Sequence, residues 1–236
     1  VAASRLPAAN SIMMLAAHVS RHRIFTEWLD PSISDESQPH LRDAQLNLYD
    51  AANPNQPPYS ADFLEHFAQA QVARNRRITA WVKEKLAAIR ASDSPWSEFA
   101  FTVHGTMADP RWLDPSIEPS DRKAGSCYLG DPKIVNDGPV GLARFCTLRS
   151  WLSQWSYDDA RCDAIASGSR ISVPVLVIGN SADDACTPSH TQRLYDAVTH
   201  EQKHLHVVKG ATHYYTGANG AEHMAEACGV IENFLV

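Results

Sequence analysis

The sequence lacks the features that would mark a membrane protein, a nucleic-acid-binding protein or a repeat protein. No apolar run among the 236 residues approaches the roughly 20 that span a bilayer. The formal net charge is −6 and there is no basic patch, which argues against nucleic acid as a partner. Neither an internal repeat nor a low-complexity tract is present. The remaining composition, 44% hydrophobic and 20% charged, is ordinary for one globular domain, with or without a lid.

The cysteines are too few and too irregularly spaced to indicate a disulfide framework or a zinc site. The five cysteines are Cys127, Cys146, Cys162, Cys186 and Cys228. Their number is odd and they include no C-x-x-C pair, which argues against a disulfide framework and against a zinc site. One or two disulfides are the alternative. We therefore expect a cytoplasmic protein, and the sequence indicates no metal and no organic cofactor.

Three apolar segments predict strands of a parallel sheet. "VPVLVIGN" (173–180) is rich in β-branched residues and ends in Gly-Asn, as a fully buried strand before a turn does. "KHLHVVKG" (203–210) predicts the next strand, with a helix over 187–198 between them and a closing helix over 220–236. "SIMMLAAHVS" (11–20) suits a third strand, although periodicity alone leaves a helix open. Strands that alternate with helices predict an α/β protein with right-handed crossovers.

The middle of the chain predicts long helices joined by loops. Ser60 is a typical N-cap, and apolar residues recur at helical spacing as far as Ala91, which predicts one long amphipathic helix. Its basic cluster is interpreted as a solvated face and consists of Arg74, Arg76 and Arg77. A strand is expected over 98–106 and a helix over 138–160, whose aromatic stripe is attributed to the core.

Two loops carry the residues that suggest chemistry. "GNSADDACTP" follows the strand at 173–180 and contains Asp183 and Asp184, and "GATHYY" follows the next strand and contains His213. The carboxyl ends of neighbouring parallel strands lie at the same edge of a sheet, where sites form. An acidic side chain there can accept a hydrogen bond from one imidazole nitrogen, which leaves the other nitrogen as a base.

These segments resemble the C-terminal part of an α/β-hydrolase. The resemblance rests on "VPVLVIGNSADDACTPSHTQRLYDAV", "KHLHVVKGATHYY" and "VIENFL". It implies an α/β-hydrolase-type parallel sheet, with residues 1–33 and 165–236 forming the core portion and 34–164 a large, mostly helical cap. It also implies a catalytic pair of Asp183 and His213, the first aspartate fitting the family's acid position better than Asp184.

The sequence departs from the family at the nucleophile. No G-x-S-x-G motif is present. Ser126 and Ser169 do not follow a predicted strand, and Ser181 lies in the acid loop itself. The chain begins at Val1 without an initiator Met or a signal-peptide pattern, so we expect a downstream piece of a hydrolase whose nucleophilic serine comes from a separate N-terminal polypeptide. The alternative is a binding or scaffold protein that lacks the nucleophile.

Four other residues were weighed as site candidates and assigned ordinary roles. His204 and His206 share a strand face, but no third metal ligand is evident. His104 lies in the predicted cap, and Cys186 is interpreted as a small buried residue.

The function expected from the resemblance is hydrolysis of a carboxylic ester in a small-molecule substrate, without membrane or nucleic-acid partners. Hydrolysis of an amide, a lactone or a carbon–carbon bond by the same residues is the alternative. The tryptophans and phenylalanines of the cap suggest an apolar or aromatic acyl or alcohol group.

Overall fold

The computed structural model describes residues 7–93 and 95–236, in which the chain forms two compact units. The start of the chain at Val1 lies outside the described residues. The first unit comprises Val1–Val19, Ser120–Arg122 and Ala164–Val236, and the second comprises Ser20–Pro119 and Lys123–Asp163. The first unit therefore ends its N-terminal segment at Val19 rather than at residue 33, and it takes in a short segment of the region expected to form the cap. The roles of core and cap stay predictions.

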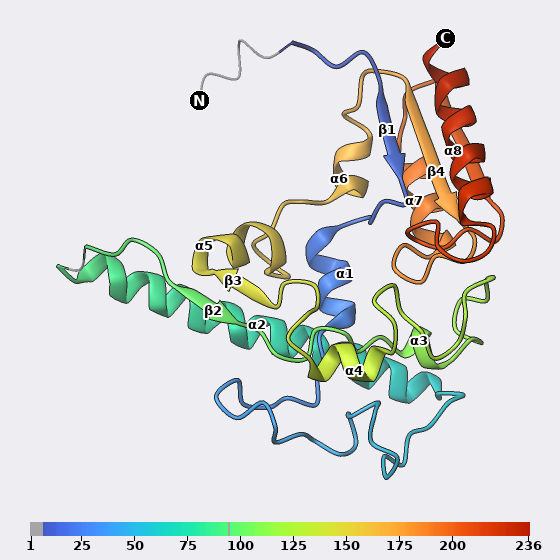
Figure 1. Ribbon diagram of the computed structural model, residues 1–236. Helices are drawn as coiled ribbons and strands as arrows, with labels where there is room; N and C mark the ends of the chain where they lie inside the picture. The colour runs from blue at the N-terminus through green and yellow to red at the C-terminus, as the bar shows by residue number, and fades with distance from the viewer. Residues whose placement is uncertain (1–6, 94) are drawn as a thin grey trace. The chain divides into compact units, whose positions relative to one another are not determined.

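The first unit is built on a parallel sheet of three strands in the order β1-β4-β5. The pair β1 and β4 lies side by side in Figure 1. The strands are β1 (Ile12–Leu15), β4 (Val175–Asn180) and β5 (Lys203–Val208). β1 pairs with β4 from Ile12 opposite Val175, and β4 pairs with β5 from Val175 opposite Lys203. All six residues of β4 are buried, as its β-branched sequence predicts for a central parallel strand. The parallel sheet and the strand nature of the first apolar run are thus confirmed.

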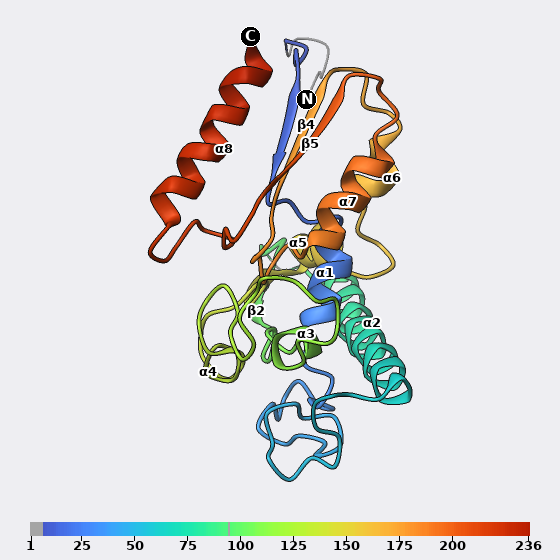
Figure 2. The ribbon, with the colours of Figure 1, turned by 90° about the vertical axis from the view of Figure 1, so that its right-hand side faces the viewer.

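Helices cover both faces of this sheet. Figure 2 shows α8 (Gly220–Leu235) on one face and α6 (Ala164–Gly168) with α7 (Pro188–Ala197) on the other. Under α8, the core consists of Leu176, Ile178, Val208, Ala211 and Ala227, with Tyr215, Val230, Ile231 and Phe234 packed against it. The burial of apolar area on both faces is what holds short parallel strands together.

The close approach of α7 to β4 depends on Gly179. A Cβ atom at this position would overlap the side chain of Thr191 on α7. We expect Gly179→Ala to lower the free energy of unfolding by about 2–4 kcal/mol, because neither element can retreat without losing contacts. Urea denaturation measures the change.

Gly229→Ala in α8 is the matched control for Gly179→Ala. A Cβ atom there meets nothing within 4 Å. Alanine is favoured over glycine in a helix interior, so stability should rise by up to about 1 kcal/mol. Equal destabilisation by both substitutions would contradict the steric explanation.

The second unit contains the long helix and several short elements. The helices are α1 (Arg21–Trp28), α2 (Ala61–Ala91), α3 (Pro110–Leu113), α4 (Pro132–Asp137), α5 (Leu148–Ser150) and the π-helix η2 (Trp151–Trp155). The strands β2 (Ala100–Thr102) and β3 (Phe145–Thr147) form an antiparallel pair. The prediction for α2 is confirmed, including its N-cap, because the Ser60 side chain accepts a hydrogen bond from the amide of Phe63.

Helices occupy less of residues 34–164 than the sequence suggested. Residues 34–60 and 114–131 contain no helix, so the prediction of a mostly helical region is wrong in extent. The strand expected over 98–106 is reduced to the three residues of β2. None of the described helices combines the length and hydropathy required to cross a membrane.

The helix predicted over 138–160 is wrong at both ends, because helical structure covers only Leu148–Ser150 and Trp151–Trp155. Gly141 adopts a φ of 145°, which is incompatible with a helix, and the chain then enters β3. Helical structure starts only after Thr147, which forms a capping box with Ser150. The aromatic stripe is part of the core at Trp151 and Trp155, whereas Phe145, expected in the same stripe, lies on β3 and is 72% exposed.

The interpretation of the basic cluster on α2 is wrong for Arg74. Its side chain is 1% exposed and forms two hydrogen bonds with the Glu36 carboxylate, at 2.9 and 2.7 Å. Its remaining donors bind the backbone carbonyls of Asp30, His104 and Gly105. A fully satisfied guanidinium can be buried at little cost, and this one joins α2 to the loops of its unit.

Candidate functional site

Asp183 and His213 meet at the carboxyl edge of the three-stranded sheet. His213 Nδ1 lies 2.9 Å from Oδ2 and 3.1 Å from Oδ1 of Asp183. The Asp183 side chain is fully buried, and that of His213 is 17% exposed. The structure therefore brings together the two residues that the sequence singled out, through the loops after β4 and β5.

The acid loop is folded around the Asp183 carboxylate. Oδ1 accepts hydrogen bonds from the backbone amides of Ala185 and Cys186, at 2.8 and 2.7 Å. The Asp183 amide in turn donates to the carbonyl of Asn180 at the end of β4. These bonds satisfy a buried charge and leave Oδ2 directed at the imidazole.

The histidine loop is joined to the acid loop by backbone and side-chain hydrogen bonds. Asn180 Nδ2 donates to the carbonyl of Thr212, and the Ala182 amide donates to the carbonyl of Ala211. Gly210, with a φ of 75°, turns the chain back after β5 and donates its amide to Ser181 Oγ. The position of His213 is therefore determined by both strands and not by its own loop alone.

Asp184 differs from Asp183 in its electrostatics. Burial, together with the negative charge of Asp183, raises the pKa of Asp184 to about 6. Below pH 6 Asp184 is mainly neutral. The geometry assigns the contact with the imidazole to Asp183.

Two of the three serine candidates, Ser181 and Ser169, occupy positions unsuited to a nucleophile beside His213. Ser181 Oγ donates to Asp121 Oδ2 at 2.6 Å while it accepts from Gly210, so it braces the two loops. Ser169 precedes β4 and lies at the amino end of that strand, about 20 Å along it from the acid loop. Ser126 belongs to the second unit.

Sequence reasoning missed His18, which lies just beyond β1 in the same unit. Its ring stacks on that of His213, with centroids 6.5 Å apart and planes 27° from parallel. Its Nδ1 lies 3.2 Å from the sulfur of Cys186. The position of His18 after a predicted strand was the available signal, since the carboxyl ends of all three strands meet here.

Cys186 is buried, at 1% exposure, as the sequence suggested. Burial and then the charge of Asp183 raise the pKa of its thiol well above the ordinary value, so the thiol stays protonated. A protonated, enclosed thiol is a poor nucleophile. All five cysteines, Cys186 among them, are free of disulfides.

Comparisons with known proteins leave the family of the chain open. No family model matches the chain, and neither does a curated protein. Among solved structures the chain is similar to a monoacylglycerol lipase of Paleococcus ferrophilus, with 18% identity and a TM-score of 0.34 over 76% of this chain. The chain spans about half of that lipase chain, 54% of its length. A TM-score of this size carries no argument about activity.

The remaining histidine candidates have structural partners. On β5, His206 Nε2 lies 2.7 Å from the Glu226 carboxylate of α8, and the ring of His204 packs against Phe234. These contacts attach α8 to the sheet, whereas the sequence favours a plain surface face for the two histidines.

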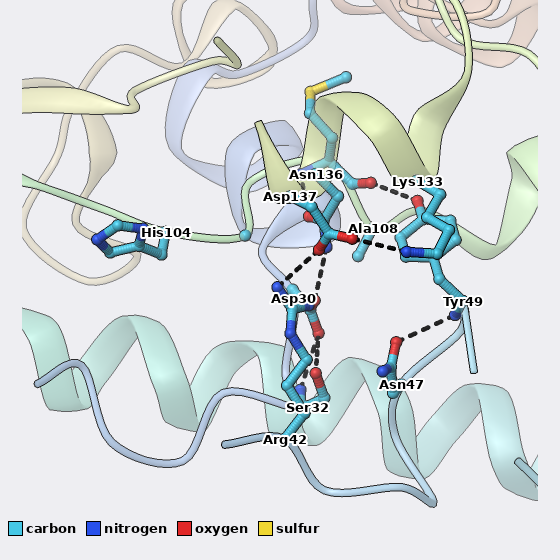
Figure 3. Close-up of polar contacts among 12 residues, drawn as sticks. Asp30, Ser32, Arg42, Asn47, Tyr49, His104, Ala108, Lys133, Asn136 and Asp137 are labelled. Carbon is cyan, nitrogen blue, oxygen red and sulfur yellow. Dashed lines mark hydrogen bonds and ion pairs between the residues drawn. The ribbon is translucent and has the colours of Figure 1, made fainter. Parts of the chain in front are cut away.

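His104 lies beside a buried polar cluster of the second unit (Figure 3). The centre of the cluster is Asp30, which accepts hydrogen bonds from Ser32, Asn136 and Arg42. Burial, followed by the nearby Arg144, lowers the pKa of His104. The cluster satisfies its own charges, and we assign it a structural role.

Proposed function

We propose that the chain contributes the general base and the orienting acid of a serine hydrolase that cleaves a carboxylic ester. The observation that carries the proposal is the 2.9 Å contact between His213 Nδ1 and the buried Asp183 carboxylate at the carboxyl edge of a parallel sheet. A carboxylate in this position holds the proton on Nδ1, so that Nε2 presents its lone pair to a nucleophile.

Each residue has a defined part in the reaction. A serine hydroxyl attacks the ester carbonyl carbon while Nε2 of His213 removes its proton, and a tetrahedral intermediate forms. The imidazolium then delivers that proton to the leaving alkoxide, and the acyl group remains on the serine. Water repeats the sequence and releases the acid. Asp183 stabilises the imidazolium that is present in both halves.

The serine of this proposal comes from a separate N-terminal polypeptide of the same hydrolase. Three observations support this origin. The sequence has no G-x-S-x-G motif, and Ser181 is engaged with Asp121 and Gly210. In the described sheet β1 is an edge strand, with Met13 and Leu15 exposed, so a further strand has an edge on which to pair.

The expected substrate is a small ester with an apolar or aromatic group. Support comes from the sequence, in which five of the six tryptophans lie within residues 34–164, the region expected to form the cap.

A fluorophosphonate probe tests the proposal. The protein is purified from its native source, treated with the probe and analysed by intact mass of every polypeptide present. We expect a second, labelled polypeptide beside this unlabelled chain, together with hydrolysis of a p-nitrophenyl ester that the probe abolishes. A single unlabelled chain without esterase activity would overturn the proposal in favour of a scaffold without a nucleophile.

A further inference from the structure

Three potential metal ligands converge next to the Asp183–His213 pair. His18, Cys186 and His190 place one ligand atom each within 4.8 Å of one another. They come from three separate segments of the first unit: the loop after β1, the loop after β4 and the first turn of α7. Cys186 and His190 are each 1% exposed, so two of the three ligands are withdrawn from bulk water.

The distances suit a tetrahedral metal ion. Zinc bonds of about 2.0–2.3 Å to nitrogen and sulfur place neighbouring ligand atoms roughly 3.3–3.7 Å apart. His18 Nδ1 and Cys186 Sγ are already 3.2 Å apart. The widest pair in the cluster, at no more than 4.8 Å, has to approach by only about 1 Å. Such a change lies within the reach of side-chain rotation.

We propose that His18, Cys186 and His190 form a binding site for a thiophilic divalent transition-metal ion, with zinc as the natural probe. Imidazole nitrogen and thiolate sulfur are both zinc ligands, the same pair of donor types also suits copper, and three protein ligands leave a fourth position for water or another small ligand. On binding, the Cys186 S–H bond is broken, sulfur bonds to the metal and the proton passes to solvent.

The site is distinct from the Asp183–His213 pair. Asp183 is engaged by two backbone amides and by His213, so it is not counted among the ligands. Cys186 nevertheless belongs to a second close group with Asp183 and His213, and the His18 ring stacks on His213. A bound ion would place its positive charge beside His213, the proposed base, and His213 itself would not be a ligand.

Titration with Co²⁺ tests the site directly. The full chain should bind one equivalent with a sulfur-to-cobalt charge-transfer band and the intense ligand-field bands of tetrahedral coordination, and Zn²⁺ should displace it. Cys186→Ser should abolish the charge-transfer band and weaken Co²⁺ affinity at least about 100-fold. Cys228→Ser, which removes an exposed cysteine on α8, should change neither.

A second variant guards against misfolding, since Cys186 is buried. If Cys186→Ser has lost its native circular dichroism, His18→Gln serves in its place, because His18 is only partly buried. It should retain the thiolate band and lose affinity by a similar factor. Absence of the charge-transfer band in the unmodified chain, or unchanged affinity in a folded variant, would overturn the proposal. Because binding is the readout, its failure is independent of the proposed esterase.

Discussion

Replacing His213 with glutamine should lower kcat for ester hydrolysis by about 10⁴-fold or more, with little change in KM. Glutamine can still hydrogen bond to Asp183 but cannot accept and return a proton, so the loss falls on the chemical steps. The serine hydroxyl would then have to react without a base. Steady-state kinetics on a p-nitrophenyl ester, with the native complex and the variant compared at one pH, measure the effect.

His206→Gln is the control for His213→Gln. His206 also pairs with a carboxylate, Glu226, at 2.7 Å, but on the strand face of β5 that α8 covers. Its replacement removes an equivalent imidazole–carboxylate pair outside the site, and kcat should stay within roughly 2-fold, as is usual for positions remote from the chemistry. Equal losses in the two variants would show that His213 acts through folding rather than as a base.

Asp183→Asn should reduce kcat by about 10⁴-fold while the fold survives. The asparagine oxygen can still accept from the amides of Ala185 and Cys186, which preserves the acid loop. The charge that stabilises the imidazolium is lost, and an NH₂ group facing the imidazole favours the wrong tautomer. Comparison of kcat with the denaturation midpoint separates the chemical effect from the structural one.

Asp184→Asn distinguishes the two neighbouring acids. Because the pKa of Asp184 is about 6, the side chain is already neutral at lower pH, and the variant should behave like the unmodified protein there. Above pH 6 the substitution removes a negative charge that interacts electrostatically with His213, and it should lower kcat by only about 5-fold. A larger loss than that of Asp183→Asn would assign the acid role to Asp184.

The sequence predicted those elements whose formation depends on neighbouring residues in the chain. A buried strand at β4 follows from its continuous β-branched run, and the start of α2 follows from the Ser60 cap. The meeting of Asp183 with His213 follows from a rule of sheet topology, since both residues come directly after neighbouring parallel strands.

What the sequence did not reveal depends on contacts between distant segments. Arg74 looks like a surface residue on its helix, and only the folded loops around Glu36 explain its burial. The ligands His18 and Cys186 are 168 positions apart, so no spacing motif could have connected them. Likewise, the φ of Gly141 interrupts a helix that the apolar pattern alone favours.

The Asp183 carboxylate both holds the imidazole and closes its own loop through two backbone amides. Selection for a stable fold would therefore retain this aspartate even in a relative without the proposed hydrolase activity. In such a relative His213 would be substituted first, because it contributes less to loop closure. The presence of the aspartate in a relative is thus weak evidence of activity. The histidine is the position at which active and inactive relatives should differ.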